Sequence, residues 1–386
     1  MKSRATALAT MVMVCSGVVS MSAEAATVQV LARTGDVVDG HTVSGAIGNR
    51  PDINNAGQVV WMANNHIFID EAIHIAPGTN IGGRIYNNVY GGAPVINNHG
   101  VVGFSFRESS PAGTLFATDT TLQFGTGDST VNGHSLTSVG AVSINDAGMI
   151  AWASSFRDGT QSISVITTPT QFLIQQGNTI SGVPVSSIPS FSRHALNSQG
   201  EALVMFADNN IRHYATQNGV IVSQGNTIGG ITLTSMDHGG SINDHGDIAF
   251  MGFFAGNTRR GIFTNDRVVA VNGDVFDGLT LHSFNGGVDI NNAGQVAFLG
   301  TFVQGGSGLF LDDELLLKTG DLIDGVAITG LGIPALNDSG LITAHVSLAD
   351  GSQAIVLVPE PASALLIAAG LLVGVRRRFR MPPAAR

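Results

Sequence analysis

Short segments in which hydrophobic and polar residues alternate recur between residues 27 and 357, and turns rich in Gly, Asn and Asp separate them. Alternation with a period of two is typical of β-strands, and this region lacks the 3.6-residue period of amphipathic helices. Within one representative stretch the pattern predicts four strands, at residues 280–284, 295–302, 308–311 and 314–318. The body of the chain is therefore predicted to be all-β.

One turn motif follows a strand in every unit and consists of an aliphatic residue, Asn, two variable residues and Gly. Its seven copies are Asn54 with Gly57, Asn97 with Gly100, Asn145 with Gly148, Asn197 with Gly200, Asn243 with Gly246, Asn291 with Gly294, and Asn337 with Gly340. Successive asparagines are 43, 48, 52, 46, 48 and 46 residues apart, whereas the step from Asn to Gly never changes. Such repetition indicates a single structural unit of about 47 residues.

The residue types in this motif predict a hairpin turn. Asn at the first position of a type I turn can bond the backbone two residues on, and Gly at the fourth accepts the left-handed conformation. We therefore favour a structural role for these asparagines over ligand binding. A second motif, Gly-Asp or Gly-Asn followed by Gly, precedes each Asn motif and also predicts a tight turn. Its copies are Gly35-Asp36 with Gly40, the degenerate Gly78-Thr79 with Gly83, Gly127-Asp128 with Gly133, Gly177-Asn178 with Gly182, Gly225-Asn226 with Gly230, Gly273-Asp274 with Gly278, and Gly320-Asp321 with Gly325.

The strand after each Asn motif is apolar on both faces. The positions five and seven residues past Asn carry mostly large side chains, as in Val59 and Trp61, whereas the position between them carries mostly small ones, such as Ala151 or Ala249. Because successive side chains of a strand point to opposite faces, both faces of each sheet must be covered by neighbouring units.

Four short strands per unit, repeated seven times, predict a seven-bladed β-propeller; a β-solenoid is the alternative. The two ends of the repeat region favour a closed ring. The last unit supplies residues 354–357 as its third strand and then stops, and residues 27–33 match the fourth strand of the other units. The N-terminal strand is therefore expected to complete the last blade and leave no open edge.

Residues 1–25 have the pattern of a secretory signal peptide. Lys2 and Arg4 are followed by a short apolar run, and Ala23 and Ala25 form the small-x-small pattern that precedes a cleavage site. The sequence thus predicts export through the Sec machinery and cleavage by signal peptidase. The single cysteine, Cys15, lies inside this segment, so the mature chain is expected to have neither disulfides nor a catalytic thiol.

The C-terminal residues 358–386 contain Pro359-Glu360-Pro361, the apolar stretch 362–375 and then Arg376, Arg377 and Arg378. Fourteen apolar residues are short for a bilayer core, so a transient membrane contact is expected. This arrangement resembles the PEP-CTERM sorting tail. The resemblance implies a Gram-negative bacterium, recognition by an exosortase, and delivery to the cell surface or extracellular matrix. Whether the tail is removed or retained stays open.

Charge separates the body from its ends. The formal net charge is −10, and residues 27–357 hold 11 Lys and Arg against 26 Asp and Glu, a net charge of −15. A protein this acidic lacks the basic footprint of nucleic-acid binding. The repeats resemble tandem Asn-x-x-Gly families of uncharacterised bacterial surface proteins, and that resemblance implies no activity.

No motif in the body predicts catalysis. The histidines show no metal-ligand spacing, and the Gly-x-Ser-x-Gly and phosphate-loop motifs are absent from the sequence. The nearest carboxylate pairs, Asp36/Asp39, Asp274/Asp277 and Asp321/Asp324, recur with the turns and so favour turn formation. No cofactor is predicted, although calcium binding by these Asp-rich turns is an alternative.

Strand alternation also places the loops on two rims. The rim with the Asn motifs is expected to be acidic, whereas the opposite rim is expected to receive Arg84, Arg107, Arg157, Arg259 and Arg260. These arginines keep the body soluble or bind an acidic polysaccharide through their guanidinium groups. The sequence thus predicts a non-enzymatic surface scaffold or binding module; a lectin-like or carbohydrate-active propeller is the alternative.

Overall fold

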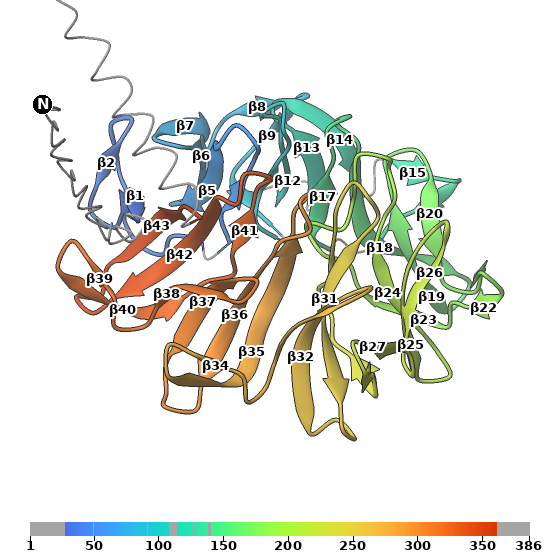
Figure 1. Ribbon diagram of the computed structural model, residues 1–386. Helices are drawn as coiled ribbons and strands as arrows, with labels where there is room; N and C mark the ends of the chain where they lie inside the picture. Colours follow the sequence, from blue (N-terminus) through green and yellow to red (C-terminus); the bar gives the residue numbers. More distant parts are fainter. Residues whose placement is uncertain are drawn as a thin grey trace, which may run out of the picture. The chain divides into compact units, whose positions relative to one another are not determined.

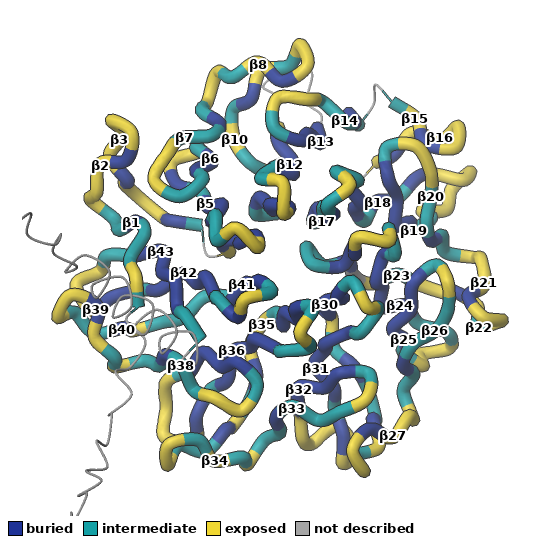
Figure 2. The backbone as a smooth tube through the Cα atoms, turned by 45° about the horizontal axis from the view of Figure 1, so that its top comes forward, coloured by how far each residue is buried: buried dark blue, intermediate teal, exposed yellow. Residues whose placement is uncertain are grey.

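The computed structural model describes residues 28–360 except residues 49, 91, 108–113, 127–128 and 138–139. The described residues form strands and turns, arranged as seven antiparallel sheets around a central axis (Figures 1 and 2). This confirms the seven-bladed β-propeller and excludes the β-solenoid. The predicted signal peptide 1–25, tail residues 361–386, Gly127 and Asp128 lie outside the described residues.

Each blade comprises a broken or continuous inner strand and three strands outside it. Blade 1 consists of β4 (Asp52–Ile53), β5 (Val59–Ala63), β6 (His66–Ile69) and β7 (Ala72–Ile75). Blade 2 consists of β10 (Asn88–Val89), β11 (Val95–Ile96), β12 (Val102–Arg107), β13 (Thr114–Thr118) and β14 (Thr121–Gly125). Blade 3 consists of β17 (Val142–Ile144), β18 (Ile150–Asp158), β19 (Gln161–Thr167) and β20 (Phe172–Gln175). Blades 4 and 5 consist of β23 (Ser187–Ser190), β24 (Val204–Asp208), β25 (Ile211–Thr216) and β26 (Gly219–Ser223); and β29 (Ser235–Met236), β30 (Ser241–Ile242), β31 (Ile248–Phe254), β32 (Arg259–Thr264) and β33 (Val268–Val271). Blades 6 and 7 consist of β35 (Leu279–Ile290), β36 (Val296–Phe302), β37 (Ser307–Leu311) and β38 (Glu314–Lys318); and β40 (Val326–Leu331), β41 (Ala335–Leu336), β42 (Ile342–Leu348), β43 (Gln353–Val358) and β1 (Gln29–Arg33).

The N-terminal strand closes the ring as the sequence predicted. β1 pairs antiparallel with β43, and Val30 lies opposite Val356 while Arg33 lies opposite Ala354. Blade 7 therefore takes its outermost strand from the beginning of the repeat region and the others from its end. This pairing covers an edge of β43 that would otherwise expose a row of backbone donors and acceptors.

The Gly-Asp motifs begin small β-hairpins between consecutive blades. The hairpins are β2 (Val37–Val38) with β3 (His41–Thr42), β8 (Asn80–Ile81) with β9 (Arg84–Ile85), β15 (Thr130–Val131) with β16 (His134–Ser135), β21 (Thr179–Ile180) with β22 (Val183–Pro184), β27 (Thr227–Ile228) with β28 (Ile231–Thr232), and β34 (Val275–Phe276) and β39 (Leu322–Ile323) with the starts of β35 and β40. Each hairpin reaches the outer strand of the next blade. A Cβ added at Gly82 would lie 2.7 Å from Leu122 in β14, and the Val220 amide in β26 donates to Ser181 Oγ.

The hydrophobic core lies between the blades, as the two-faced strands predicted. Val59 and Trp61 of β5 belong to the cluster that includes Ala335 and Leu357 of blade 7, whereas Val60 packs into the cluster shared with blade 2. All three β5 residues are at most 1% exposed. Within the described residues, no helix has the length and apolar character needed to cross a bilayer.

Candidate functional site

All seven Asn motifs form the hairpin turn that their residue types predicted. In blade 1 the Asn54 Oδ1 accepts the amides of Ala56 and Gln58, and the Gly57 amide donates to the Asn54 carbonyl at 2.9 Å. Gly57 has φ of 80°, in the left-handed region that other residues resist. The same closing bond, with φ between 75° and 82°, recurs at Gly100, Gly148, Gly200, Gly246, Gly294 and Gly340. These glycines thus shape the backbone and leave the contacts between blades to the asparagine side chains.

The seven turn asparagines form a closed ring of hydrogen bonds from blade to blade, here called the asparagine ring. The Asn54 Nδ2 of blade 1 donates to the carbonyl of Asn97 in blade 2 at 3.1 Å. The same link joins Asn97 to Asn145, Asn145 to Asn197, Asn197 to Asn243, Asn243 to Asn291, Asn291 to Asn337, and Asn337 back to Asn54. Each asparagine therefore builds its own turn with Oδ1 and bonds the next blade with Nδ2.

The residues that follow these asparagines form a second ring, the mouth ring, at one opening of the channel. Its members are Asn55, Asn98, Asp146, Ser198, Asp244, Asn292 and Asp338. In six of the seven steps a backbone amide donates to the side-chain oxygen of the next blade's member; for example, the Asp338 amide donates to Asn55 Oδ1 at 2.9 Å. The step from Asp146 to Ser198 breaks the series, since the Ser198 side chain is shorter than Asn or Asp. A cavity of about 140 Å³ lies at this mouth.

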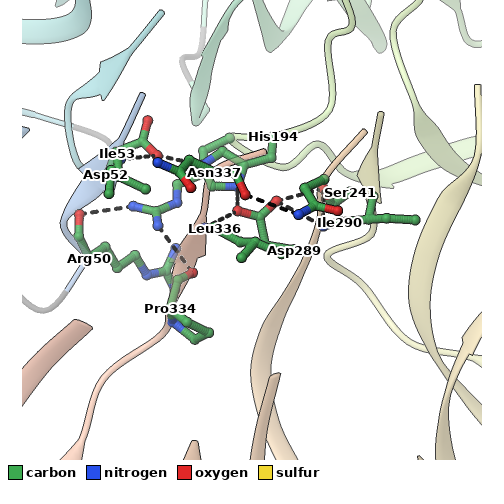
Figure 3. Close-up of polar contacts among 12 residues, drawn as sticks. Arg50, Asp52, Ile53, His194, Ser241, Asp289, Ile290, Pro334, Leu336 and Asn337 are labelled. Carbon is green, nitrogen blue, oxygen red and sulfur yellow. Dashed lines mark hydrogen bonds and ion pairs between the residues drawn. The ribbon is translucent and has the colours of Figure 1, made fainter. Parts of the chain in front are cut away.

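Two residues of blade 4, Arg193 and His194, cross the channel and close it; we call them the plug. The His194 Nε2 lies 2.9 Å from Asp52 Oδ1 of blade 1, and its Nδ1 lies 2.8 Å from Asp289 Oδ2 of blade 6. Figure 3 shows His194 between the two carboxylates. The Arg193 guanidinium donates to the carbonyls of Arg50 in blade 1 and Pro334 in blade 7. The plug thus ties blade 4 to three blades on the other side of the axis.

His194 is held as an imidazolium. Burial opposes the charged ring, but Asp289 and Asp52 outweigh burial and raise the pKa of His194 to about 9. Burial by itself would raise the pKa of Asp52, yet His194, Arg193 and the Ile96 amide hold it below its usual value. With both ring nitrogens donating, His194 binds two carboxylates at once.

The two plug carboxylates also accept backbone and hydroxyl donors. Asp52 Oδ2 accepts the Ile96 amide of blade 2 at 2.9 Å, and Asp289 Oδ2 accepts the Leu336 amide of blade 7 at 2.9 Å. Asp289 Oδ1 further accepts the Ser241 hydroxyl at 2.9 Å. Each of these four oxygens therefore has a bonded donor, with Asp52 and Asp289 only 4% exposed. Through these contacts the two carboxylates connect the plug to the neighbouring blades and help to hold the ring of blades together.

The plug divides the mouth ring from a larger cavity on the opposite side of the channel, here called the vestibule. The vestibule has a volume of about 450 Å³, within the usual range for small-molecule sites of roughly 300–1,000 Å³. Its lining comes from six blades and includes Arg50, Phe191, Asp237, His238, Val288 and Ile333. Gly239, Gly240, Gly286 and Gly287 bring backbone rather than side chains to its wall. It is about three times as large as the cavity at the mouth ring.

The five predicted rim arginines come from different parts of the ring. Arg84 lies in hairpin β8–β9, which runs along the next blade. In blades 2 and 3 the Arg107 guanidinium lies 3.4 Å from the Tyr90 ring centre and Arg157 donates to the Thr160 carbonyl. In blade 5, Arg259 and Arg260 each lie 5.0 Å from a phenylalanine ring centre. Four of the five thus contact groups of their own blade, and their role in ligand binding stays a prediction.

Three acidic residues on the Asn-motif side, which was predicted to be acidic, act in turns. Asp70 Oδ1 accepts the Val59 amide at 2.8 Å, and Asp119 and Asp312 make the same contact in blades 2 and 6. Each of these carboxylates joins the turn after the third strand to the first residue of the second strand. Burial and the neighbouring carboxylates of Asp313 and Glu360 raise the pKa of Glu314.

The three carboxylate pairs also form turns. Asp36, Asp274 and Asp321 accept the amide three residues before them, and Asp39, Asp277 and Asp324 have φ near +50°. Among the described residues, no group of three His, Cys, Asp or Glu side chains is placed to hold a metal ion. The calcium alternative therefore gains no support from the described turns.

Sequence reasoning missed the plug. Two features of the sequence mark it. The first is the spacing between successive turn asparagines, which is longest, at 52 residues, between Asn145 and Asn197, the interval that contains Arg193 and His194. The position two residues before Asn is aspartate in units 1 and 6, whereas the other units carry Val95, Ser143, Ala195, Ser241 and Ala335. Departures from a repeat thus mark the residues with individual roles.

No family model matches the chain, and no curated protein matches it. Among solved structures it is similar to the polysaccharide lyase Uly1, with 10% identity over 85% of this chain and 94% of that one and a TM-score of 0.39. It is also similar to extracellular domains 1–2 of Drosophila Semaphorin 1a, with 9% identity over 86% and 88% and a TM-score of 0.37. A third similar structure is the extracellular domain of BT4673 from B. thetaiotaomicron, with 12% identity and a TM-score of 0.38. The match covers 80% of this chain but only 38% of that one, so this chain spans less than half of its length. These similarities are too low to assign an activity.

Proposed function

We propose that this chain is an exported surface or matrix protein whose propeller binds or holds other molecules without transforming them. The observation that carries the proposal is the plug. A non-repeating cluster of His, Arg and Asp is where a propeller of this kind would place acid–base chemistry, but here Asp52, His194 and Asp289 bind each other and the backbone. A cluster that is already paired supports closure of the ring rather than proton transfer.

The vestibule supports binding because it offers a concave site whose floor is fixed by the plug. Sites of this kind combine apolar walls with a few polar groups that orient a ligand. The Arg193 side chain is fixed by the two carbonyls to which it donates, so the floor does not have to be ordered when a ligand arrives.

Surface delivery is proposed from the two ends of the chain. The signal-peptide pattern ending at Ala25 supports export, and the sorting motif with its arginine cluster supports recognition by an exosortase. The Glu360 side chain accepts from Gln295 Nε2 at 3.1 Å, so the last described residue of the motif contacts blade 6. We expect the intact chain in the cell-surface or matrix fraction.

The localisation is tested by fractionating producing cells that carry either the intact gene or one lacking residues 359–386. The intact chain should be found in the surface or matrix fraction, and the shortened chain should move to the medium or the periplasm. Equal distribution of the two would overturn the sorting proposal.

A carbohydrate-active enzyme is the second candidate, because Asp52, His194 and Asp289 are a convergent carboxylate–histidine cluster. Incubation of the full chain with neutral and acidic polysaccharides distinguishes the two functions. Co-sedimentation without new reducing or unsaturated ends supports a binding module. Product formation that His194→Gln abolishes while the folded protein persists would replace it with the enzyme.

A further inference from the structure

The vestibule has a cationic side that is open to a ligand. Arg50 lies exposed at its wall, and among the described residues its guanidinium has neither an ion pair nor a hydrogen bond, whereas its carbonyl is bonded by Arg193. The Arg193 guanidinium lies close enough to that of Arg50 for the two positive charges to repel. An anion placed beside Arg50 relieves this repulsion and gains charge-assisted hydrogen bonds.

The far side of the vestibule differs in character. There the Asp237 Oδ1 accepts the His238 amide at 2.8 Å, which leaves the other carboxylate oxygen to accept from a ligand. The turn around these residues is fixed from below, because the Tyr214 hydroxyl donates to the Asp237 carbonyl at 2.6 Å. This side therefore favours a ligand with hydroxyl or other donor groups.

Apolar side chains line the wall between these two sides. Phe191 and Val288 are each 8% exposed, and Ile333 and Pro334 continue the surface from blade 7. A Cβ on Gly287 would lie 3.3 Å from Ile333, so the glycine keeps the backbone close to this wall. Such a surface suits the carbon–hydrogen face of a small ring.

From these three features we infer that the vestibule binds a sugar acid, a single ring that carries one carboxylate and several hydroxyl groups. The carboxylate binds Arg50, the hydroxyls donate to Asp237, and one ring face packs on Val288 and Ile333. This inference rests on the proposed binding function and names the ligand class for it. The volume of about 450 Å³ is adequate for one such ring with bound water.

The geometry favours a sugar acid over an α-amino acid. Arg50 belongs to blade 1 and Asp237 to blade 5, which lie on nearly opposite sides of a seven-bladed ring. An α-amino acid carries its two charges on groups bonded to one carbon and cannot reach both sides. A six-membered ring separates its carboxylate from its distant hydroxyls and can do so.

Calorimetric titration of the full chain with D-glucuronate, D-glucose and L-alanine tests the inference. Glucuronate should bind, whereas glucose, which has the same ring without the carboxylate, and alanine should bind at least about tenfold more weakly. Arg50→Gln should weaken glucuronate binding by about tenfold. The control Lys318→Gln, which removes a positive charge from the outer strand of blade 6, should leave it unchanged. Ile333→Trp fills the vestibule without altering charge and should abolish binding.

The outcomes separate this inference from the proposed function. If Arg50→Gln and Ile333→Trp bind glucuronate as tightly as the unaltered chain, or if Lys318→Gln loses binding instead, the vestibule is not the sugar-acid site. Stronger binding of alanine or equal binding of glucose would overturn the ligand class. Polysaccharide co-sedimentation without monosaccharide binding would refute the vestibule inference alone, whereas failure of both would refute the binding module as well.

Discussion

The asparagine ring and the plug occupy the same channel but stabilise it in different ways. The ring repeats one neutral hydrogen bond seven times, and every blade gives and receives the same contact. The plug uses charges from three blades, with His194 between Asp52 and Asp289. The ring therefore sets the common geometry of the blades, while the plug fixes particular blades across the axis and closes the channel.

The two devices should respond differently to the loss of one member. A neutral link that is removed leaves unbonded amide groups, whereas a missing carboxylate leaves a buried charge without its partner. Buried charges are more costly to leave uncompensated than neutral groups are. The comparison thus predicts a ranking of effects, from the plug to the ring.

The largest effect is expected for Asp289→Ala. This change leaves the His194 imidazolium with one carboxylate and removes the acceptor for the Leu336 amide and the Ser241 hydroxyl. We expect the free energy of unfolding to fall by about 3–5 kcal/mol. Urea denaturation followed by fluorescence measures it, and Asp313→Ala, an exposed carboxylate on blade 6, serves as the control. An equal loss in the two variants would refute the plug as a stabilising cluster.

The second effect is a pH dependence that belongs to the plug. The pKa of His194 is raised to about 9 in the folded protein from 6.5 in the unfolded chain. The stabilisation is therefore fully present below pH 6.5 and is lost as the pH rises through 9, about 3 kcal/mol in total. Denaturation at pH 6.5 and 9.5 measures the loss. His194→Gln should be less stable at pH 6.5 and should show a much smaller change between the two values; an unchanged slope would assign the pH dependence to other groups.

The repeated residues made the fold predictable from the sequence. Asn54 and Gly57 specify a local turn, and the apolar strand from Val59 to Trp61 specifies two covered faces, so neither inference needs distant contacts. Because both faces of each of the seven repeat units must be covered by a neighbour, the units were expected to form a closed ring or an open spiral. The match of residues 27–33 to a fourth strand favoured closure, and the pairing of β1 with β43 confirms it.

The plug could not be predicted in the same way. Asp52, His194 and Asp289 are separated by 142 and 95 residues and belong to three units, so their proximity arises only when the ring has closed. The vestibule is likewise built by single residues from several blades. The asparagines were correctly assigned to turns. Their hydrogen bonds to the next blade depend on how the blades are arranged around the channel, and the local sequence pattern does not contain this information.

A smaller effect is expected in the asparagine ring. The Asn243 Oδ1 accepts the amides of His245 and Asp247, and its Nδ2 donates to the Asn291 carbonyl at 3.1 Å. Asn243→Ala removes both functions and should lower the free energy of unfolding by about 2 kcal/mol. Asn243→Asp keeps the turn acceptors but loses the donor to blade 6. If Asp is as stable as Asn, the link between blades contributes nothing and the turn explains the motif.

The smallest effect tests whether the mouth ring obeys the same rule as the asparagine ring. Ser198 interrupts the mouth ring because its hydroxyl does not reach the Asp146 amide. At the same position of blade 6, Asn292 accepts the Asp244 amide at 2.8 Å. Ser198→Asn supplies the missing acceptor and should raise the free energy of unfolding by about 0.5–1 kcal/mol. Ser198→Ala, which adds no acceptor, should be neutral. Ser198 belongs to the blade that carries the plug. If Ser198→Asn is destabilised instead, the shorter serine side chain makes room for Arg193 and His194. The irregularity of blade 4 then extends to the mouth of the channel.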